Sequence, residues 1–522
     1  DYAVYGGIYR DVRLIVKSPV NIASHLHETP EVSREDANFT WRTQVQNHSN
    51  KDVNATLETK ILAPGTGKEV KTMRADKHIP QGKTILFEGN TAVVQPRLWS
   101  PENPRLYKVR STVIVDGQAI DQVENPLGFR WYTLENHQAF RLNGEKSYLK
   151  GINRHQDMQG KGYALSNADH RRDVEIIKNM GFNFLRQAHY PADPAWVHAC
   201  DSLGMMLWME IPVSTAVSPA PGFKKNARSQ LREMIQQYYN HPSVIVWGIG
   251  NESDRIGVPE KEASEAYTTQ LLKELNTLAH ELDPYRPTTG CNFAHQDNQE
   301  IVDIYSPQNW AGWYGGEYTD YRPRKLIGEY GSSSHLLSHD ADFNAFSDKK
   351  PWTQEYSCRY HEYKASRGMA RKDSFPGNCV WVAFDFASPR KDRDINPIPY
   401  MNQKGIYLHD HETPKDVAYF YESFYTDGRK NPMVYIVSHT WKDRIKNPGK
   451  LDVWAYSNCD SVKLYNGTKG KTYGARQRTA GPRNDTRFQW NSILIENPVL
   501  YAEGYVNGSV AARDTLQFNG FD

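Results

Sequence analysis

The sequence predicts a multidomain protein in which a (β/α)8 barrel, or TIM barrel, is flanked by immunoglobulin-like β-sandwiches. Its 522 residues are too many for one ordinary domain and indicate about three. Apolar and polar residues alternate near both ends of the chain, whereas strands and helices take turns in the middle. We therefore expect a sandwich over residues 15–128, the barrel over 129–428 and a second sandwich over 429–522.

The two outer blocks resemble sandwiches because their alternating segments are short and are separated by Gly, Pro and Asn turns. Residues 39–45 and 108–115 alternate in this way in the first block. Residues 434–437 and 451–456 do so in the last block. Such a rhythm is typical of β-sandwiches.

The middle block changes at about residue 145 to strands followed by helices. Val174, Ile177 and Met180 form one helical stripe, which the cap candidates Ser166 and Asp169 open. Eight strands with helical connections match the size and rhythm of a (β/α)8 barrel. The eight expected strands are 148–153, 182–189, 205–211, 243–252, 287–293, 301–309, 325–331 and 379–386.

Two glutamates end strands of this block. Glu252 closes the fourth strand and Glu329 lies near the end of the seventh, where such a barrel places its chemistry. Two carboxylates facing one cleft are the minimum equipment for hydrolysing a glycosidic bond, one as the proton donor and one as the ionised partner. A paired structural carboxylate is the alternative for either residue alone. The strand order around the two favours the catalytic interpretation.

Composition excludes some classes of function. Lys plus Arg number 63 against 61 Asp plus Glu, so the net charge of +2 implies no basic surface for nucleic acid. The five cysteines include no Cys-x-x-Cys pair and signal neither a zinc site nor a disulfide framework. No apolar stretch approaches the roughly 18 residues of a membrane span. No signal peptide is evident, and the absence of an initiator Met at Asp1 fits a fragment.

Four motifs resemble those of glycoside hydrolase family 2. They are Gly-Ile-Asn-Arg-His at 151–155 in the first strand, 185–191 in the second, Asn251-Glu252 for the acid/base and 328–331 for the nucleophile. The similarity runs over nearly the whole chain. It implies a retaining exo-acting β-glycosidase in which Glu329 is the nucleophile and Glu252 the acid/base.

The resemblance also implies residues that bind the sugar. Asn251 would contact the 2-hydroxyl, a contact that strengthens in the transition state. His155 and His189 would hydrogen-bond other hydroxyls, with a buried structural imidazole as the alternative for each. Arg186 would keep the nucleophile ionised by charge pairing.

The eighth strand supplies two further candidates. Trp381 is the expected stacking platform, although without the family it would be interpreted as core. Asp385 is a candidate hydroxyl acceptor, and a structural ion pair is the alternative.

The sequence favours a β-galactosidase. The run over 377–388 and the segments 402–405 and 415–421 resemble β-galactosidases of Bacteroidetes. Asn402 and Lys404, however, are similar to the Asn-x-Lys pair with which β-glucuronidases hold a sugar carboxylate, and a lysine suits an anionic sugar as a point charge. β-Glucuronidase is therefore the alternative, and a catalytically silent carbohydrate-binding homologue is the third.

Three departures from the family are visible. Residues 1–14 resemble only the last strand of the N-terminal jelly-roll sugar-binding domain of relatives. The run after the sixth strand lacks the usual tyrosine that would touch the nucleophile, which leaves Tyr314 and Tyr305 as substitutes. The residues after Glu210 offer no Glu and His of a magnesium site, so no metal is expected.

The resemblance finally implies the partners. We expect an oligosaccharide or polysaccharide substrate, no cofactor, no nucleic acid and no membrane span. A homo-oligomer and a periplasmic or secreted location are compatible with the family.

Overall fold

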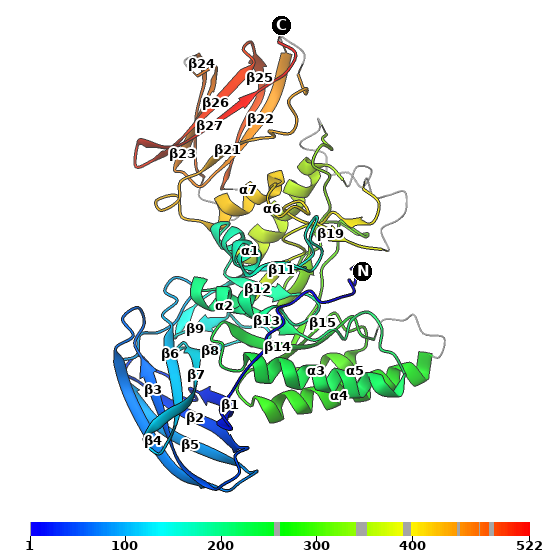
Figure 1. The fold of residues 1–522 in the computed structure, drawn as a ribbon. Coiled ribbons are helices and arrows are strands. Elements are labelled where there is room, and N and C mark those ends of the chain that lie inside the picture. The colour runs from blue at the N-terminus through cyan, green and yellow to red at the C-terminus, as the bar shows by residue number, and fades with distance from the viewer. Residues whose placement is uncertain are drawn as a thin grey trace. The chain divides into compact units, whose positions relative to one another are not determined.

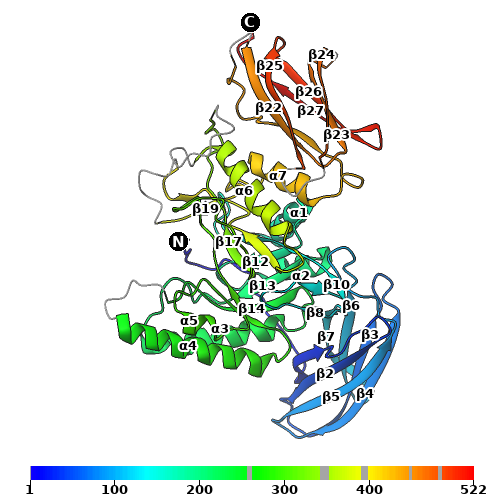
Figure 2. The ribbon, with the colours of Figure 1, turned by 180° about the vertical axis from the view of Figure 1, so that it is seen from behind.

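The computed structural model describes residues 2–254, 261–340, 352–389, 398–445, 449–468, 470–479 and 485–521. Figures 1 and 2 show the helices and strands of the chain from two sides. The chain divides into two compact units. The first unit comprises residues 1–8, 148–186 and 307–522, and the second comprises 9–147 and 187–306.

The expected first sandwich is present in the second unit, as two antiparallel sheets. In β2, Phe39, Trp41 and Val45 face inward and are almost completely buried. Leu57 and Val109 of the other sheet belong to the same core. One sheet is ordered Val20–Glu28 (β1), Asp36–Asn47 (β2) and Thr84–Val94 (β5); the other is Glu69–Ile79 (β4), Val53–Leu62 (β3), Tyr107–Val115 (β6) and Gln118–Leu127 (β7).

The jelly-roll strand expected over residues 1–14 stays a prediction. The structure assigns no strand to residues 2–19. A jelly-roll strand needs hydrogen-bonded neighbours, and none of the sheets in the described part of the chain includes these residues. Val12, Leu14, Ile15 and Val16 are exposed apolar residues.

The barrel strands are present in the expected order. All eight predictions overlap an observed strand, although the last strand ends earlier than expected because the chain turns away after Val380. The strands are Leu149–Arg154 (β11), Phe184–Gln187 (β12), Met206–Glu210 (β13), Val244–Asn251 (β14), Thr288–Cys291 (β15), Ile304–Ser306 (β16), Ile327–Tyr330 (β17) and Gly377–Val380 (β18).

These strands form one eight-stranded sheet in the order β16-β15-β14-β13-β12-β11-β18-β17. The described pairings β11–β18, β13–β14, β14–β15, β15–β16 and β17–β18 are all parallel. A further parallel bridge joins Gln308 to Glu329. Nearly every strand residue is buried, as expected when helices cover the outer face of a parallel sheet.

Helix α1, Asn167–Asn179, begins at a cap that the sequence provides. Ser166 accepts from the backbone N–H of Asp169, and the Asp169 carboxylate accepts from the backbone N–H of Ser166, which makes a capping box. Val174 and Ile177 of the predicted stripe are buried. The helices are Asn167–Asn179 (α1), Pro194–Leu203 (α2), Pro221–Tyr238 (α3), Lys261–Leu282 (α4), Gln296–Gln299 (α5), Gln354–Met369 (α6) and Asp416–Tyr425 (α7).

A second sandwich is present near the C-terminal end of the first unit, as predicted. Its core includes Ile436, Trp490 and Leu500. One sheet is ordered Val434–Val437 (β21), Gly449–Ser457 (β22) and Arg487–Ile495 (β25); the other is Lys471–Gln477 (β24), Ser461–Asn466 (β23), Val499–Val506 (β26) and Ser509–Gln517 (β27). Short strands complete the fold at Tyr132–Thr133 (β8), Arg141–Leu142 (β9), Glu145–Lys146 (β10), Phe386–Ala387 (β19) and Met401–Asn402 (β20).

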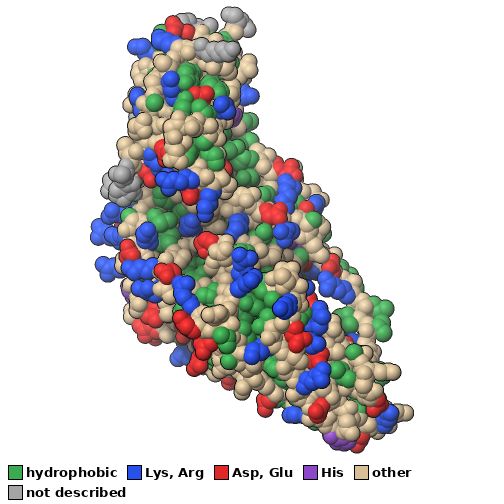
Figure 3. All heavy atoms as spheres, turned by 90° about the vertical axis from the view of Figure 1, so that its left-hand side faces the viewer, with side chains coloured by type: hydrophobic (Ala, Val, Ile, Leu, Met, Phe, Trp, Pro, Cys, Tyr) green, Lys and Arg blue, Asp and Glu red, His purple; other side chains and the backbone are tan. Residues whose placement is uncertain are grey.

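The surface carries both signs of charge. Figure 3 shows basic and acidic side chains interspersed over the face in view, in keeping with the small net charge. Among the described helices, none is long and apolar enough to cross a membrane.

Candidate active site

Glu329 lies in β17 of the first unit and is held by an arginine. The Arg186 side chain, from β12, is fully buried and donates from Nη1 to Glu329 Oε1 at 2.7 Å. Arg186 also donates to Asn153 Oδ1 at 3.2 Å, while Asn153 Nδ2 donates to the carbonyls of Gly328 and Val380. A guanidinium this close favours the ionised carboxylate, as the sequence predicted. Asn153 stands in the first-strand motif, but its contact with Arg186 was not predicted from the sequence.

Glu252 lies in the second unit, directly after β14. Its φ of +52° is in the left-handed region, which is uncommon for a residue with a side chain and is frequent at functional sites. The backbone N–H of Glu252 donates to the Cys291 carbonyl at 2.8 Å, and Asn292 Nδ2 donates to Glu252 Oε1 at 3.3 Å. Asn292 follows β15, so its place at a strand end was the signal that could have identified it.

Asn251 precedes Glu252 at the end of β14. It is 4% exposed, and its amide Nδ2 lies 3.3 Å from Ser214 Oγ. Its backbone N–H donates to the carbonyl of Val213, which fixes the strand end. The residue beside Glu252 is therefore held in place by the loop that follows β13.

The two candidate histidines follow strands in different units. In the second unit, His189 Nδ1 lies 2.6 Å from Oε1 of the buried Glu210 at the end of β13. Glu210 fixes the orientation of the His189 ring. The sequence did not predict this contact. In the first unit, the His155 ring packs against Phe386 at 4.1 Å between centroids and edge-on to Trp381 at 5.3 Å.

The eighth-strand candidates differ in character. Trp381 is 6% exposed and packs edge-on against Phe386 as well as against His155, so its ring is held rigidly. Asp385 Oδ1 accepts from Lys415 Nζ at 2.9 Å and from the backbone N–H of Gly405 at 2.8 Å. Burial raises the pKa of Asp385 to about 6 against the attraction of Lys415. These contacts correspond to the alternative that the sequence left open, a structural ion pair.

Asn402, Lys404 and Tyr314 are brought together within the first unit. Asn402 Oδ1 accepts from the backbone N–H of Lys404 at 3.2 Å. The Lys404 ammonium donates to the Tyr314 hydroxyl and lies over the rings of Trp310, Trp313 and Tyr314 at 4.9, 5.7 and 4.6 Å. Lys404 is 3% exposed, whereas Tyr314 is 62% exposed.

Tyr305, the other candidate for the missing tyrosine, is buried in the second unit. Its hydroxyl donates to the Phe293 carbonyl at 3.2 Å. The contact of Tyr314 or Tyr305 with the nucleophile Glu329 stays a prediction.

Two groups of side chains elsewhere have the composition of metal ligands. His198, Asp201 and His241 in the second unit place three ligand atoms within 4.8 Å of one another, and His339, Glu355 and Asp416 in the first unit do the same. The sequence spacing did not reveal either group, because their members come together only in the fold.

A (β/α)8 barrel with glutamates at the ends of its fourth and seventh strands, one of them held by a buried arginine, defines a protein of the glycoside hydrolase class. The model described as "Glycosyl hydrolases family 2, TIM barrel domain" matches residues 133–426, and that described as "Glycosyl hydrolases family 2" matches 20–130. The chain belongs to this family. A domain of unknown function matches residues 448–512.

The relatives extend beyond the length of this chain. A protein of Formosa agariphila, named provisionally as a β-glucuronidase, is 33% identical over 99% of this chain and 65% of its own length. The β-galactosidase BoGH2A of Bacteroides ovatus is 26% identical over 90% of this chain and 60% of its own. A crystal structure of a Bacteroides uniformis β-glucuronidase is 30% identical, with a TM-score of 0.89, and is covered to 64%. The chain thus spans about two thirds of these relatives.

Proposed function

We propose that the chain carries the catalytic machinery of a retaining exo-acting β-glycosidase. The contact of Arg186 with Glu329 supports this most directly, because it keeps a buried strand-end carboxylate ionised. Glu252 follows a parallel strand of the same sheet, and the carboxyl ends of barrel strands open onto one face. Two such carboxylates are the equipment of a glycosidase.

The reaction proceeds in two displacements. The Glu329 carboxylate attacks the anomeric carbon and forms a glycosyl ester, while Glu252 transfers its proton to the departing glycosidic oxygen. Glu252, now ionised, then takes a proton from water, and the resulting hydroxide displaces Glu329 from the anomeric carbon. The sugar leaves with its original configuration, and both carboxyl groups return to their starting states.

Neighbouring side chains orient the sugar. Asn251 directs its amide to the 2-hydroxyl, a contact that strengthens as positive charge develops on the ring. His189, oriented by Glu210, and His155, packed against Trp381, hydrogen-bond other hydroxyls. The rigid Trp381 ring forms an apolar wall for a sugar face.

The substrate that we propose is a β-glucuronide. The sequence favoured a β-galactoside, but the relatives with the higher identity are named as β-glucuronidases, which supports the alternative better. Lys404 and Asn402 would contact the sugar carboxylate. The aromatic rings around Lys404 keep its side chain in one place while its ammonium retains capacity for further hydrogen bonds.

A β-galactosidase is the second candidate. The Lys404 ammonium already has the Tyr314 hydroxyl and three aromatic rings as partners, so the lysine could serve the pocket wall alone. Relatives at 26% identity are named as β-galactosidases. A silent carbohydrate-binding homologue would retain the fold without turnover.

One panel separates these functions. Wild-type protein is assayed with aryl β-glucuronide and aryl β-galactoside, alongside Lys404→Ala and the exposed control Lys71→Ala of β4. We expect the glucuronide to be preferred, and Lys404→Ala to reduce its kcat/KM about ten- to a hundred-fold, since a charge-assisted bond is worth roughly 1.5–3 kcal/mol. Preference for the galactoside, unchanged in Lys404→Ala, would reject the glucuronide. No turnover of either would reject the enzyme.

A further inference from the structure

A groove of about 520 Å³ opens in the second unit, at the opposite end of β14 from Glu252. Arg130 in its wall donates to the carbonyls of Pro242 and Val244, and Val244 is the first residue of β14. An eight-residue strand spans about 26 Å at 3.3 Å per residue, so the groove is remote from the acid/base. Its volume lies within the usual range for ligand pockets, about 300–1,000 Å³.

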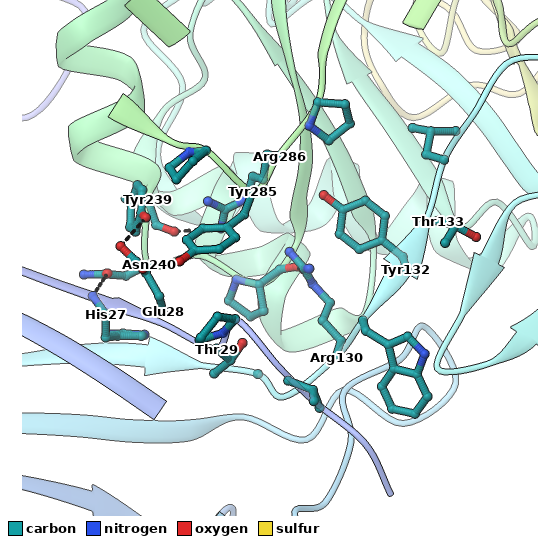
Figure 4. A pocket seen from close by; sticks show the side chains of 18 of the residues that line it. His27, Glu28, Thr29, Arg130, Tyr132, Thr133, Tyr239, Asn240, Tyr285 and Arg286 are labelled. Carbon is teal, nitrogen blue, oxygen red and sulfur yellow. Dashed lines mark hydrogen bonds between the residues drawn. The ribbon is translucent and has the colours of Figure 1, made fainter. Parts of the chain in front are cut away.

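Aromatic rings border this groove. Figure 4 shows the Tyr132 and Tyr285 rings on either side of the Arg130 side chain, with open space between them. The Tyr132 hydroxyl donates to the Ile245 carbonyl at 2.7 Å, which fixes that ring. Tyr285 is 53% exposed. Its backbone N–H donates to the Asp283 carboxylate, which fixes the loop that carries the ring. Trp131 also lines the groove. Exposed, rigid rings are platforms on which sugar faces stack.

Charges of both signs line the groove: the carboxylates of Glu28, Glu135 and Asp303 and the guanidiniums of Arg130 and Arg286. Glu28 pairs with Arg42, outside the lining. Arg286 pairs with Asp283 at 2.7 Å and donates to three backbone carbonyls, so its guanidinium is satisfied. Arg130, in contrast, contacts carbonyls and the Tyr132 ring at 5.0 Å, and no carboxylate among the described residues lies within ion-pair distance of it. Burial lowers the pKa of Arg130 to about 10, which leaves it charged at neutral pH. A desolvated cation of this kind favours an anionic partner.

We propose that this groove is a second carbohydrate site, which binds an anionic sugar residue through its carboxylate or sulfate on Arg130 and its ring face on Tyr285. The site does not take part in hydrolysis. Occupation would hold an acidic glycan on the enzyme while another part of the glycan is processed. This inference does not depend on which sugar the catalytic pocket accepts.

The test is calorimetric titration with three probes: glucuronate, glucose 6-sulfate and neutral glucose. Each titration is carried out in Lys404→Ala as well as in wild type, and the loss of affinity on adding Arg130→Met assigns the binding to the groove rather than to the catalytic pocket. We expect an anionic probe to bind Lys404→Ala with one equivalent, and adding Arg130→Met to raise its Kd at least tenfold. Preference for glucuronate or for glucose 6-sulfate identifies the carboxylate or the sulfate as the recognised group.

Further variants separate binding from folding. Arg130→Lys keeps the charge and should retain part of the affinity, while Tyr285→Ala removes an exposed ring and should weaken binding without unfolding the protein. Arg74→Met in β4 removes an exposed positive charge elsewhere and should change nothing. Hydrolysis should be unaltered in the groove variants. Should Arg130→Met fail to fold, Tyr285→Ala and Arg130→Lys decide the question.

Three outcomes would overturn the site: no anionic probe binds Lys404→Ala, glucose binds as well as the anions, or Tyr285→Ala and the Arg130 variants bind like wild type. Failure of the proposed catalytic function is distinguishable from these. It would appear as absence of turnover in wild type, whatever the titrations show.

Discussion

The contact between Arg186 and Glu329 shows which side-chain pairings can be predicted from the sequence. Their pairing was predictable because both stand in strand motifs whose strands meet in one sheet. The pairing of Asp385 with Lys415 was not decided by sequence, because the lysine is 30 positions away and its partner depends on how the chain turns after the eighth strand. Strand-end positions are thus easier to predict than the partners of buried charges.

The acid/base role of Glu252 predicts a dependence on the leaving group. In Glu252→Gln the first step should slow about 10²- to 10⁴-fold for an alkyl glycoside, whose oxygen needs a proton, and change little for a dinitrophenyl glycoside. Pre-steady-state kinetics measure that step, with the exposed Glu300→Gln as control. Equal loss on both substrates would assign Glu252 another role.

A buried histidine predicts acid sensitivity of the first sandwich. Burial lowers the pKa of His25 to about 4, whereas an unfolded histidine titrates near 6.5. Below about pH 6.5 the unfolded state therefore binds a proton that the folded state does not, and stability is lost as pH falls toward about 4.

Between pH 7 and pH 5, protonation of His25 in the unfolded state should lower the free energy of unfolding by about 2 kcal/mol. Urea unfolding of wild type and His25→Gln at both pH values measures it. The variant should lose about 2 kcal/mol less than wild type over that interval. An equal loss in both proteins would show that His25 does not carry the effect.

The presence and order of the helices and strands were easier to predict than the residues at which they begin and end. All eight barrel strands are confirmed, since apolar runs followed by helical stripes leave little choice of assignment. The jelly-roll strand expected over residues 1–14 stays a prediction, because a strand requires a hydrogen-bonding neighbour and none of the described sheets includes these residues. The start of α1 was predictable from Ser166 and Asp169, whose capping box is local in sequence.

That capping box makes a prediction for α1. Ser166→Ala should lower the free energy of unfolding by about 1 kcal/mol, because the N–H of Asp169 loses its acceptor. Chemical denaturation measures the change, with Ser229→Ala in the exposed face of α3 as the control. A loss no larger than in the control would mean that the cap contributes nothing to stability.

At the scale of the whole molecule, the architecture and the family could be predicted from the sequence. The sugar that the enzyme accepts was harder to predict. In the function that we propose, that choice depends on one buried ammonium, Lys404, which lies among rings from the loop after the sixth strand. The family match and the barrel are confirmed, while the relatives support the glucuronide better than the galactoside. A lysine that binds the substrate carboxylate and a lysine that only packs in the pocket wall look the same in the sequence.

Double displacement by Glu329 and Glu252 requires their carboxyl groups to stand about 5–5.5 Å apart, rather than the roughly 6.5–9.5 Å of an inverting enzyme. Proton NMR of the first sugar released from an aryl β-glycoside tests this most directly. We expect the β-anomer to appear first and then to mutarotate. Initial release of the α-anomer would contradict double displacement.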